Sequence, residues 1–81
     1  MIPWRSLPIV NMVYEAVEER TAGGDRPVRI EEVSDWVLKR FDYRLSEAEL
    51  SKSLLTLETL GYVRVLRTGK DVIVKLVKKV E

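Results

Sequence analysis

The side chains of this chain that could do chemistry are carboxylates, ammonium groups and guanidinium groups, because cysteine and histidine are absent. Their absence removes thiolate nucleophiles, disulfides, most structural zinc sites and the usual proton shuttle of enzymes. Acidic pairs occur at Glu18-Glu19 and Glu31-Glu32, but adjacent side chains on a helix diverge by about 100° and cannot converge on one atom. We therefore expect no catalytic residue, no metal site, no cofactor and no enzymatic activity.

The basic residues are concentrated in the last quarter of the chain. Residues 1–60 carry 8 basic and 11 acidic side chains, whereas residues 61–81 carry 6 basic and 2 acidic ones, so that the net charges are −3 and +4. In the second segment Arg64, Arg67, Lys70 and Lys75 can contact phosphates, and each neutralised phosphate releases counterions. The alternative is that these cations only keep an exposed edge hairpin from aggregating.

The composition predicts one folded domain over residues 1–81. A chain of 81 residues that is 46% hydrophobic and 33% charged is too short to divide and too apolar to be disordered. No apolar run approaches the roughly 18 residues of a membrane span, and residues 1–10 lack a signal core. We expect a cytoplasmic protein without membrane attachment. Asn11 is the only asparagine and glutamine is absent, which is typical of thermophilic proteins.

Hydrophobic periodicity predicts the elements that must position the cations. We expect helices at about 7–22, 31–41 and 47–60, a short strand at 28–30 and a hairpin at 62–77. In the second helix Val33, Val37 and Phe41 recur at helical spacing and predict its buried face, with Trp36 alongside in the core.

The third helix has the clearest start and end signals. Ser46 and Glu49 match the capping box, in which the serine hydroxyl accepts from the third helical amide and the glutamate accepts from the serine amide. Gly61 is expected to end the helix. The apolar residues between them fall on one face: Leu50, Leu54, Leu57 and Leu60.

The hairpin register depends on its turn. If Gly69-Lys70 is a two-residue turn, Thr68 pairs with Asp71, and a longer loop would shift this register. The two-residue turn also pairs Val65 with Val74 and Val63 with Leu76. The other face of the hairpin would then carry Arg64, Leu66, Ile73 and Lys75.

Two segments resemble the winged-helix (winged helix-turn-helix) superfamily of bacteria and archaea. Leu57-Glu58-Thr59-Leu60-Gly61-Tyr62-Val63 resembles the junction by which these proteins leave the recognition helix and enter the wing, and Arg29-Ile30-Glu31-Glu32-Val33 resembles their short strand and the start of helix 2. The resemblance covers residues 7–77. It implies an α+β fold, a three-helix winged helix-turn-helix with a C-terminal β-hairpin wing.

The resemblance also implies double-stranded DNA as partner. In that superfamily the exposed face of helix 3 enters the major groove, and by position this face carries Glu47, Ser51, Lys52, Leu55 and Thr56. Glu47 and Ser51 would read base edges and Lys52 would contact phosphate or guanine. However, Glu47, Glu49 and Glu58 make this helix acidic, so a merely solvated face is the alternative.

Two functions follow. The first is a small DNA-binding transcriptional regulator that acts as a homodimer, since one winged helix buries little surface on DNA. The second is a protein-interaction module of a larger transcription, replication or membrane-remodelling assembly. Interface candidates are Trp4, ahead of the first helix, and the apolar side chains expected to be exposed, namely Leu55, Leu66 and Ile73.

Overall fold

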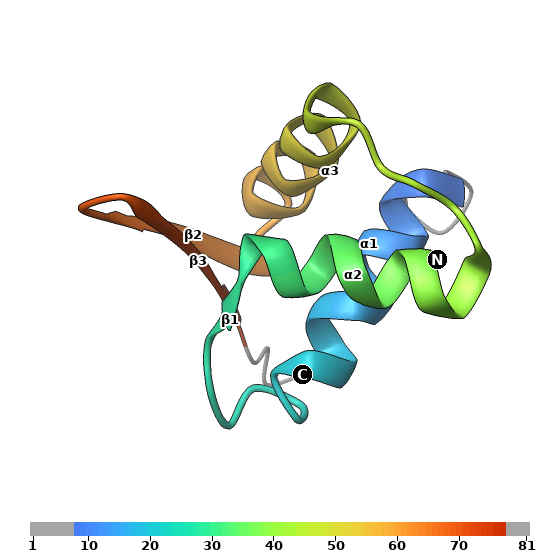
Figure 1. Cartoon of the computed structure of the whole chain (residues 1–81). Helices are drawn as coiled ribbons and strands as arrows, with labels where there is room; N and C mark the ends of the chain where they lie inside the picture. The colour runs from blue at the N-terminus through green and yellow to red at the C-terminus, as the bar shows by residue number, and fades with distance from the viewer. Residues whose placement is uncertain (1–7, 78–81) are drawn as a thin grey trace.

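A computed structural model of the chain describes residues 8–77, so that Trp4 lies outside the described residues. The element order is α1 (Pro8–Arg20), β1 (Val28–Arg29), α2 (Ile30–Phe41), α3 (Glu47–Thr59), β2 (Val63–Thr68) and β3 (Asp71–Leu76). The three helices pack together, and the β2–β3 hairpin, here called the wing, projects from them on one side (Figure 1). This is the α+β arrangement that the sequence predicted.

The first helix is shorter than predicted, because the chain turns before the glycine pair. Helix α1 ends at Arg20, and Ala22 adopts a left-handed conformation with φ of 53°. The amide of Gly23 donates to the carbonyl of Glu18 at 3.0 Å, and the amide of Ala22 donates to that of Glu19 at 3.2 Å. This is the Schellman arrangement of a helix end, with alanine at the position that usually carries glycine.

The other bounds differ from the prediction by one residue. Strand β1 covers two residues rather than three, because Ile30 already begins α2, and α3 ends at Thr59. Gly61 then turns the chain with φ of 84°, while the Tyr62 amide donates to the Leu57 carbonyl at 2.9 Å. The predicted capping box at Ser46 and Glu49 is confirmed, with both hydrogen bonds formed at 3.0–3.1 Å.

The core lies where the helices meet the sheet. Three of the four predicted leucines of α3 are buried, and Leu60 is half-buried against the core. Removing a buried leucine such as Leu57 typically costs about 2–5 kcal/mol, so α3 is firmly seated. The buried apolar residues are Val10, Val13, Ala16, Val17, Val28, Val33, Val37, Leu50, Leu54, Leu57, Val63 and Val74.

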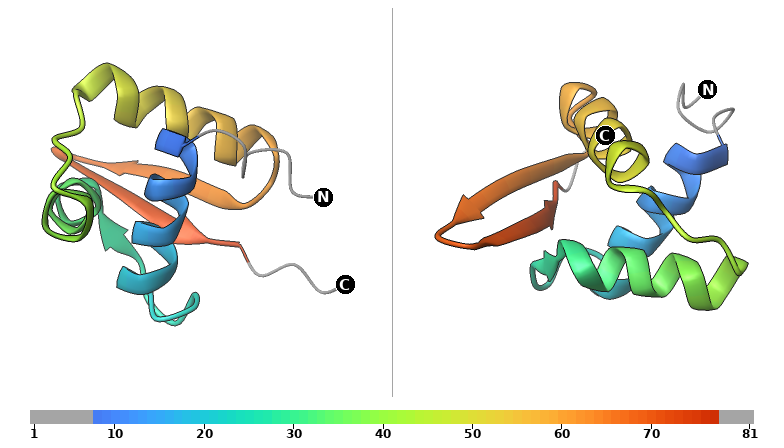
Figure 2. Two further views of the ribbon diagram at one scale, coloured as in Figure 1. Left: turned by 90° about the vertical axis from the view of Figure 1, so that its right-hand side faces the viewer. Right: turned by 45° about the horizontal axis from the view of Figure 1, so that its top comes forward.

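The sheet has the strand order β1-β3-β2, and both pairings are antiparallel. The predicted two-residue turn is confirmed, because Thr68 pairs with Asp71 and Val65 pairs with Val74. Val28 pairs with Val74 in turn, so the three strands bring a row of valines onto the core face. The pairing of β1 with β3 joins the start of α2 to the wing (Figure 2).

Two predictions of burial are wrong. Phe41 was expected in the core but is 39% exposed, because it is the last residue of α2 and the chain turns directly after it, at Asp42 with φ of 54°. Trp36 packs against the core as predicted, although it is only half-buried, and it lies edge to face on Phe41 with ring centroids 5.8 Å apart. Conversely, Leu66 and Ile73 were expected to be exposed but are half-buried where they pair across the wing.

Candidate nucleic-acid interface

Helix α3 and the wing enclose a shallow groove of about 270 Å³, here called the α3–wing groove. Ser51 and Leu55 lie one helical turn apart on α3 and face Arg67 of the wing across this groove. Leu55 is 63% exposed. The full lining is Ile30, Ser51, Leu54, Leu55, Glu58, Val65, Arg67 and Val72. Two of the predicted helix residues and one predicted wing residue therefore meet in one place.

Lys52 and Thr56 lie on a different side of α3. Both line an apolar groove between α3 and the start of α1, together with Pro8 and Ile9. Thr56 is half-buried as a residue, and its hydroxyl donates to the Lys52 carbonyl at 2.9 Å. Figure 2 shows α1 on one side of α3 and the wing on the other. Of these two residues, only the exposed Lys52 has a side chain that can contact phosphate.

The wing cations divide between the two faces of the hairpin, because side chains alternate along a strand. Arg67 shares the face of Val63 and Val65, whereas Arg64 and Lys75 are directly paired on the opposite face. Lys70 lies at the turn. The wing therefore carries cations on both faces and at its turn, an arrangement that allows it to lie between the two phosphate backbones of a duplex.

Arg29 joins the second of these faces and was not anticipated. It pairs with Ile73, which in turn pairs with Leu66, so that Arg29 lies on the same sheet face as Arg64 and Lys75. Strand alternation would have indicated this once β1 was known to pair with β3, but that pairing joins segments far apart in the sequence.

The wing cations have no partner inside the described chain. Within residues 8–77, the side chains of Arg64, Arg67, Lys70 and Lys75 form no hydrogen bond or ion pair with another residue. All four residues are exposed. Their charges are therefore available to an external anion.

Two of the three carboxylates of α3, in contrast, are engaged in the fold. Glu58 Oε2 accepts from the Val65 amide at 3.2 Å and so links α3 to the outer edge of β2. Glu49 closes the capping box, and its other oxygen accepts from the Tyr43 hydroxyl at 2.6 Å. Only Glu47 is left without such a contact in the described chain, one turn before Ser51 on the exposed face.

The Glu49 contacts perturb its titration. The hydrogen bond from Tyr43, and secondly that from the Ser46 amide, lower the pKa of the Glu49 carboxyl, and the same hydrogen bond raises the pKa of Tyr43. Glu49 therefore stays ionised, in the first turn of α3, where negative charge is favoured by the helix dipole. The negative charge of Glu49 therefore stabilises the N-terminal end of α3.

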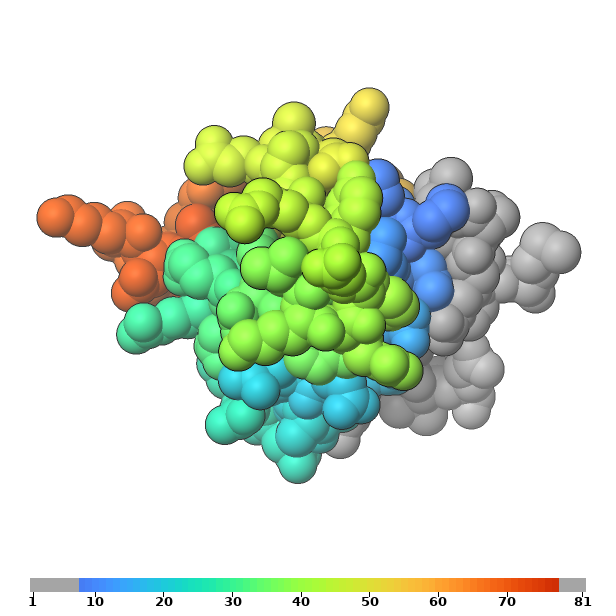
Figure 3. All heavy atoms as spheres, turned by 45° about the vertical axis from the view of Figure 1, so that its right-hand side comes forward, coloured from blue at the N-terminus to red at the C-terminus, as the bar shows by residue number. Residues whose placement is uncertain are grey.

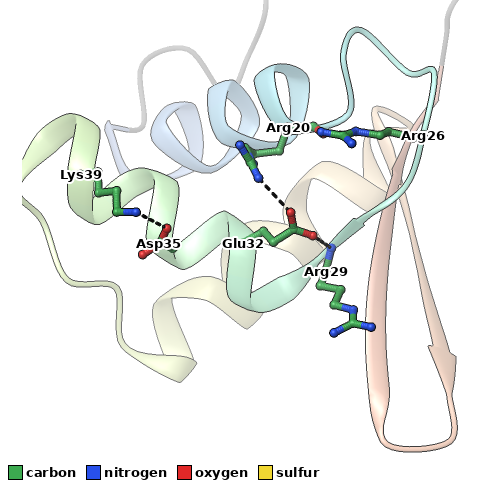
Figure 4. A network of polar contacts seen from close by, with 6 residues as sticks. All are labelled: Arg20, Arg26, Arg29, Glu32, Asp35 and Lys39. Carbon is green, nitrogen blue, oxygen red and sulfur yellow. Dashed lines mark hydrogen bonds and ion pairs between the residues drawn. The ribbon is translucent and has the colours of Figure 1, made fainter.

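A polar network positions β1 and the start of α2 (Figure 4). Glu32 accepts from the Arg29 amide at 3.1 Å and from the Arg20 guanidinium at 3.0 Å, and both bonds lower the pKa of the Glu32 carboxyl. The Arg20 contact joins α1 to α2. The network therefore fixes the helix end from which Arg29 extends.

Two further kinds of feature, a metal-binding cluster and a membrane-spanning helix, are absent from the described residues. Between residues 8 and 77, no group of three acidic side chains is arranged to hold a metal ion. None of the described helices is long and apolar enough to cross a membrane.

A helix, a short strand, two further helices and a C-terminal hairpin, in this order, define the winged-helix fold. A matching solved structure comes from a study of the DNA recognition and protein interaction domains of HOP2 and its homologous DNA pairing. The two chains superpose with a TM-score of 0.63 at 20% sequence identity, over 84% of this chain and 97% of the other. At this identity the likeness shows the fold. No protein-family model and no curated protein matches the sequence.

Proposed function

We propose that this domain binds double-stranded DNA through the wing and the wing-facing side of α3. The observation that carries the proposal is the set of four exposed wing cations, which have no hydrogen-bond or ion-pair partner within residues 8–77. The HOP2 structure with the same fold comes from work on DNA recognition, which supports the proposal.

In this mode Ser51 and Leu55 approach base edges while the wing contacts the backbone. Ser51 supplies a hydroxyl, and Leu55 offers apolar contact to a thymine methyl group. Arg67 and Lys70 contact one phosphate strand, and Arg64 and Lys75 on the opposite face contact the other. We propose a transcriptional regulator that acts as a homodimer and carries out no catalytic step.

The experiment is a titration of the protein with duplex DNA over a range of salt concentrations. Four phosphate contacts predict that log K falls against log salt with a slope of roughly −3 to −4. A slope near zero, or no binding at low salt, would refute the proposal. A fourfold alanine variant at Arg64, Arg67, Lys70 and Lys75 is the matched comparison.

The exposure of Leu55 favours a second candidate. A leucine that is 63% exposed beside Leu54, Val72 and Ile30 offers an apolar anchor to a protein partner, as expected for a module of a larger assembly. Leu55→Ser would then abolish binding of the partner and leave the salt slope on DNA unchanged. Arg67→Ala would have the opposite effect.

A further inference from the structure

The side of the molecule formed by α1 and α2 carries an aromatic pair, half-buried Trp36 and exposed Phe41, that the proposed DNA contacts do not use. Trp36 and Phe41 pack edge to face with an interplanar angle of 70°, and the Arg40 guanidinium lies 5.8 Å from the Phe41 ring centroid. Aromatic and arginine side chains are the types that anchor protein interfaces. Figure 3 shows α2 and the end of α1 together on one face, here called the α1–α2 face.

Two hollows of opposite charge adjoin this aromatic pair. One, of about 360 Å³, is lined by Arg20, Lys39 and Arg40, with Asp35 as its only acid. The other, of about 380 Å³, is lined by three acids of α1, with Arg40 as its only base. Those acids are Glu15, Glu18 and Glu19. Trp36 and Arg40 line both hollows, so the sign of the charge reverses across this pair.

This arrangement is complementary to itself. Rotation by 180° about an axis near Trp36 places the basic hollow of one copy over the acidic hollow of another, and the reverse contact forms at the same time. A twofold interface requires one patch that matches itself in this way. The aromatic rings then meet at the centre, where burial contributes most to binding.

The internal ion pairs of the face do not prevent such pairing. Arg20 is held by Glu32 at 3.0 Å, so Lys39 and Arg40 supply the positive charge of the basic hollow to a second copy. Lys39 and Asp35 are 3.1 Å apart, with side chains that are 77% and 58% exposed, and such exposed pairs contribute little stability. Lys39 can therefore exchange Asp35 for a glutamate of another copy. Glu18 and Glu19 are exposed and form no side-chain hydrogen bond or ion pair within residues 8–77.

We infer that the α1–α2 face is the surface by which two copies of this chain form a symmetric dimer, an inference that rests on the proposed homodimer. This face shares no residue with the α3–wing groove. Both wings of such a dimer remain free for DNA. The patch is small, so the dimer is a weak one that depends on concentration and salt.

The test uses two charge-reversed variants of the whole chain. Glu18→Lys/Glu19→Lys makes both hollows basic, and Lys39→Glu/Arg40→Glu makes both acidic. Each variant alone brings like charges together, which should weaken self-association at least about tenfold. An equimolar mixture restores opposite charges at both contacts, so a heterodimer should form. Sedimentation equilibrium without DNA, at low salt and from micromolar to millimolar protein, measures all three samples.

Circular dichroism verifies that each variant is folded, and the four altered residues are exposed. A wild-type chain that stays monomeric over this range, variants that associate like the wild type, or a mixture that fails to recover association would each overturn the inference. If the wild type is monomeric and the variant Lys39→Glu/Arg40→Glu no longer binds duplex DNA, the α1–α2 face is a DNA contact and not a dimer interface. Because no DNA is present in sedimentation, failure here leaves the salt-slope test of the wing unaffected.

Discussion

Helix α3 and the wing are adjacent, yet they use their charges in opposite ways. On α3, Glu49 and Glu58 form hydrogen bonds inside the molecule. On the wing, Arg64, Arg67 and their neighbours Lys70 and Lys75 form none with the described residues. The α3 carboxylates keep their negative charge in these hydrogen bonds, and two of the three also stabilise the fold, whereas the wing cations are available to a ligand.

Reversal of the wing charges should have the largest effect. Arg67→Glu/Lys70→Glu replaces two phosphate contacts with two repulsions, so duplex affinity at low salt should fall by about 100-fold and the magnitude of the salt slope by about 2. Fluorescence anisotropy with a labelled duplex measures both. Arg44→Glu, in the exposed turn before α3, is the control and should change affinity only slightly. If Arg44→Glu lowers duplex affinity as much as Arg67→Glu/Lys70→Glu does, the wing cations contribute no more to DNA binding than a cation elsewhere on the molecule.

The junction between the two regions depends on Gly61, which has φ of 84°. Gly61→Ala forces a side chain into the left-handed region and should lower the free energy of unfolding by about 1–2 kcal/mol. Ala22→Gly provides the reciprocal control, because Ala22 already has φ of 53°, and it should stabilise the chain. Urea denaturation measures both variants. If the urea midpoint of Gly61→Ala equals that of the wild type, the connection between α3 and the wing does not require glycine at this position.

Substitutions of Glu58 and Glu47 compare a carboxylate of α3 that stabilises the fold with one that makes no such contact within the described residues. Glu58→Ala removes the acceptor of the Val65 amide and should cost about 0.5–1.5 kcal/mol of stability. Glu47→Ala removes an uncommitted charge and should raise affinity about twofold to fivefold, since repulsion near the surface is worth about 1 kcal/mol or less.

Glu58→Gln keeps an oxygen acceptor and is therefore the matched control for the Glu58 bond. It should retain more stability than Glu58→Ala, as measured by urea denaturation. If Glu58→Ala is as stable as the wild type, the bond to the Val65 amide does not stabilise the fold and the account of α3 fails.

Glu49 should give the smallest and most specific effect. Its pKa is lowered in the folded chain, first by Tyr43 and then by Ser46, so the folded state binds a proton more weakly than the unfolded state. The resulting stabilisation is complete above the unfolded pKa of about 4.3 and is lost as the pH falls through the lower folded value. Glu49→Gln should therefore melt below the wild type at pH near 7, and the gap should narrow in acid. A gap independent of pH would contradict the assignment.

Local signals in the sequence predicted much of this fold. The capping box, the leucine spacing of α3 and the two-residue turn depend on neighbouring residues, and each is present in the structure. The burial of Phe41 was predicted wrongly because helical spacing does not show whether the last residue of a helix is covered by another element. Arg29 was missed because its face is set by the pairing of β1 with β3.

The candidate site was predicted as one set of residues, but tertiary structure divides it. Ser51, Leu55 and Arg67 meet in the α3–wing groove, while Thr56 turns toward α1. The contact between Glu58 and the Val65 amide joins elements whose relative position no short motif specifies. The assignment of these residues to DNA stays a prediction.

Residue-by-residue mapping of duplex binding tests the central claim most directly. Amide chemical shifts recorded by NMR during titration with duplex DNA at low salt should change most in residues 64–72 and around Ser51 and Leu55. They should change little on the α1–α2 face around Trp36. Shifts confined to α1 and α2, with an unaffected wing, would contradict the account.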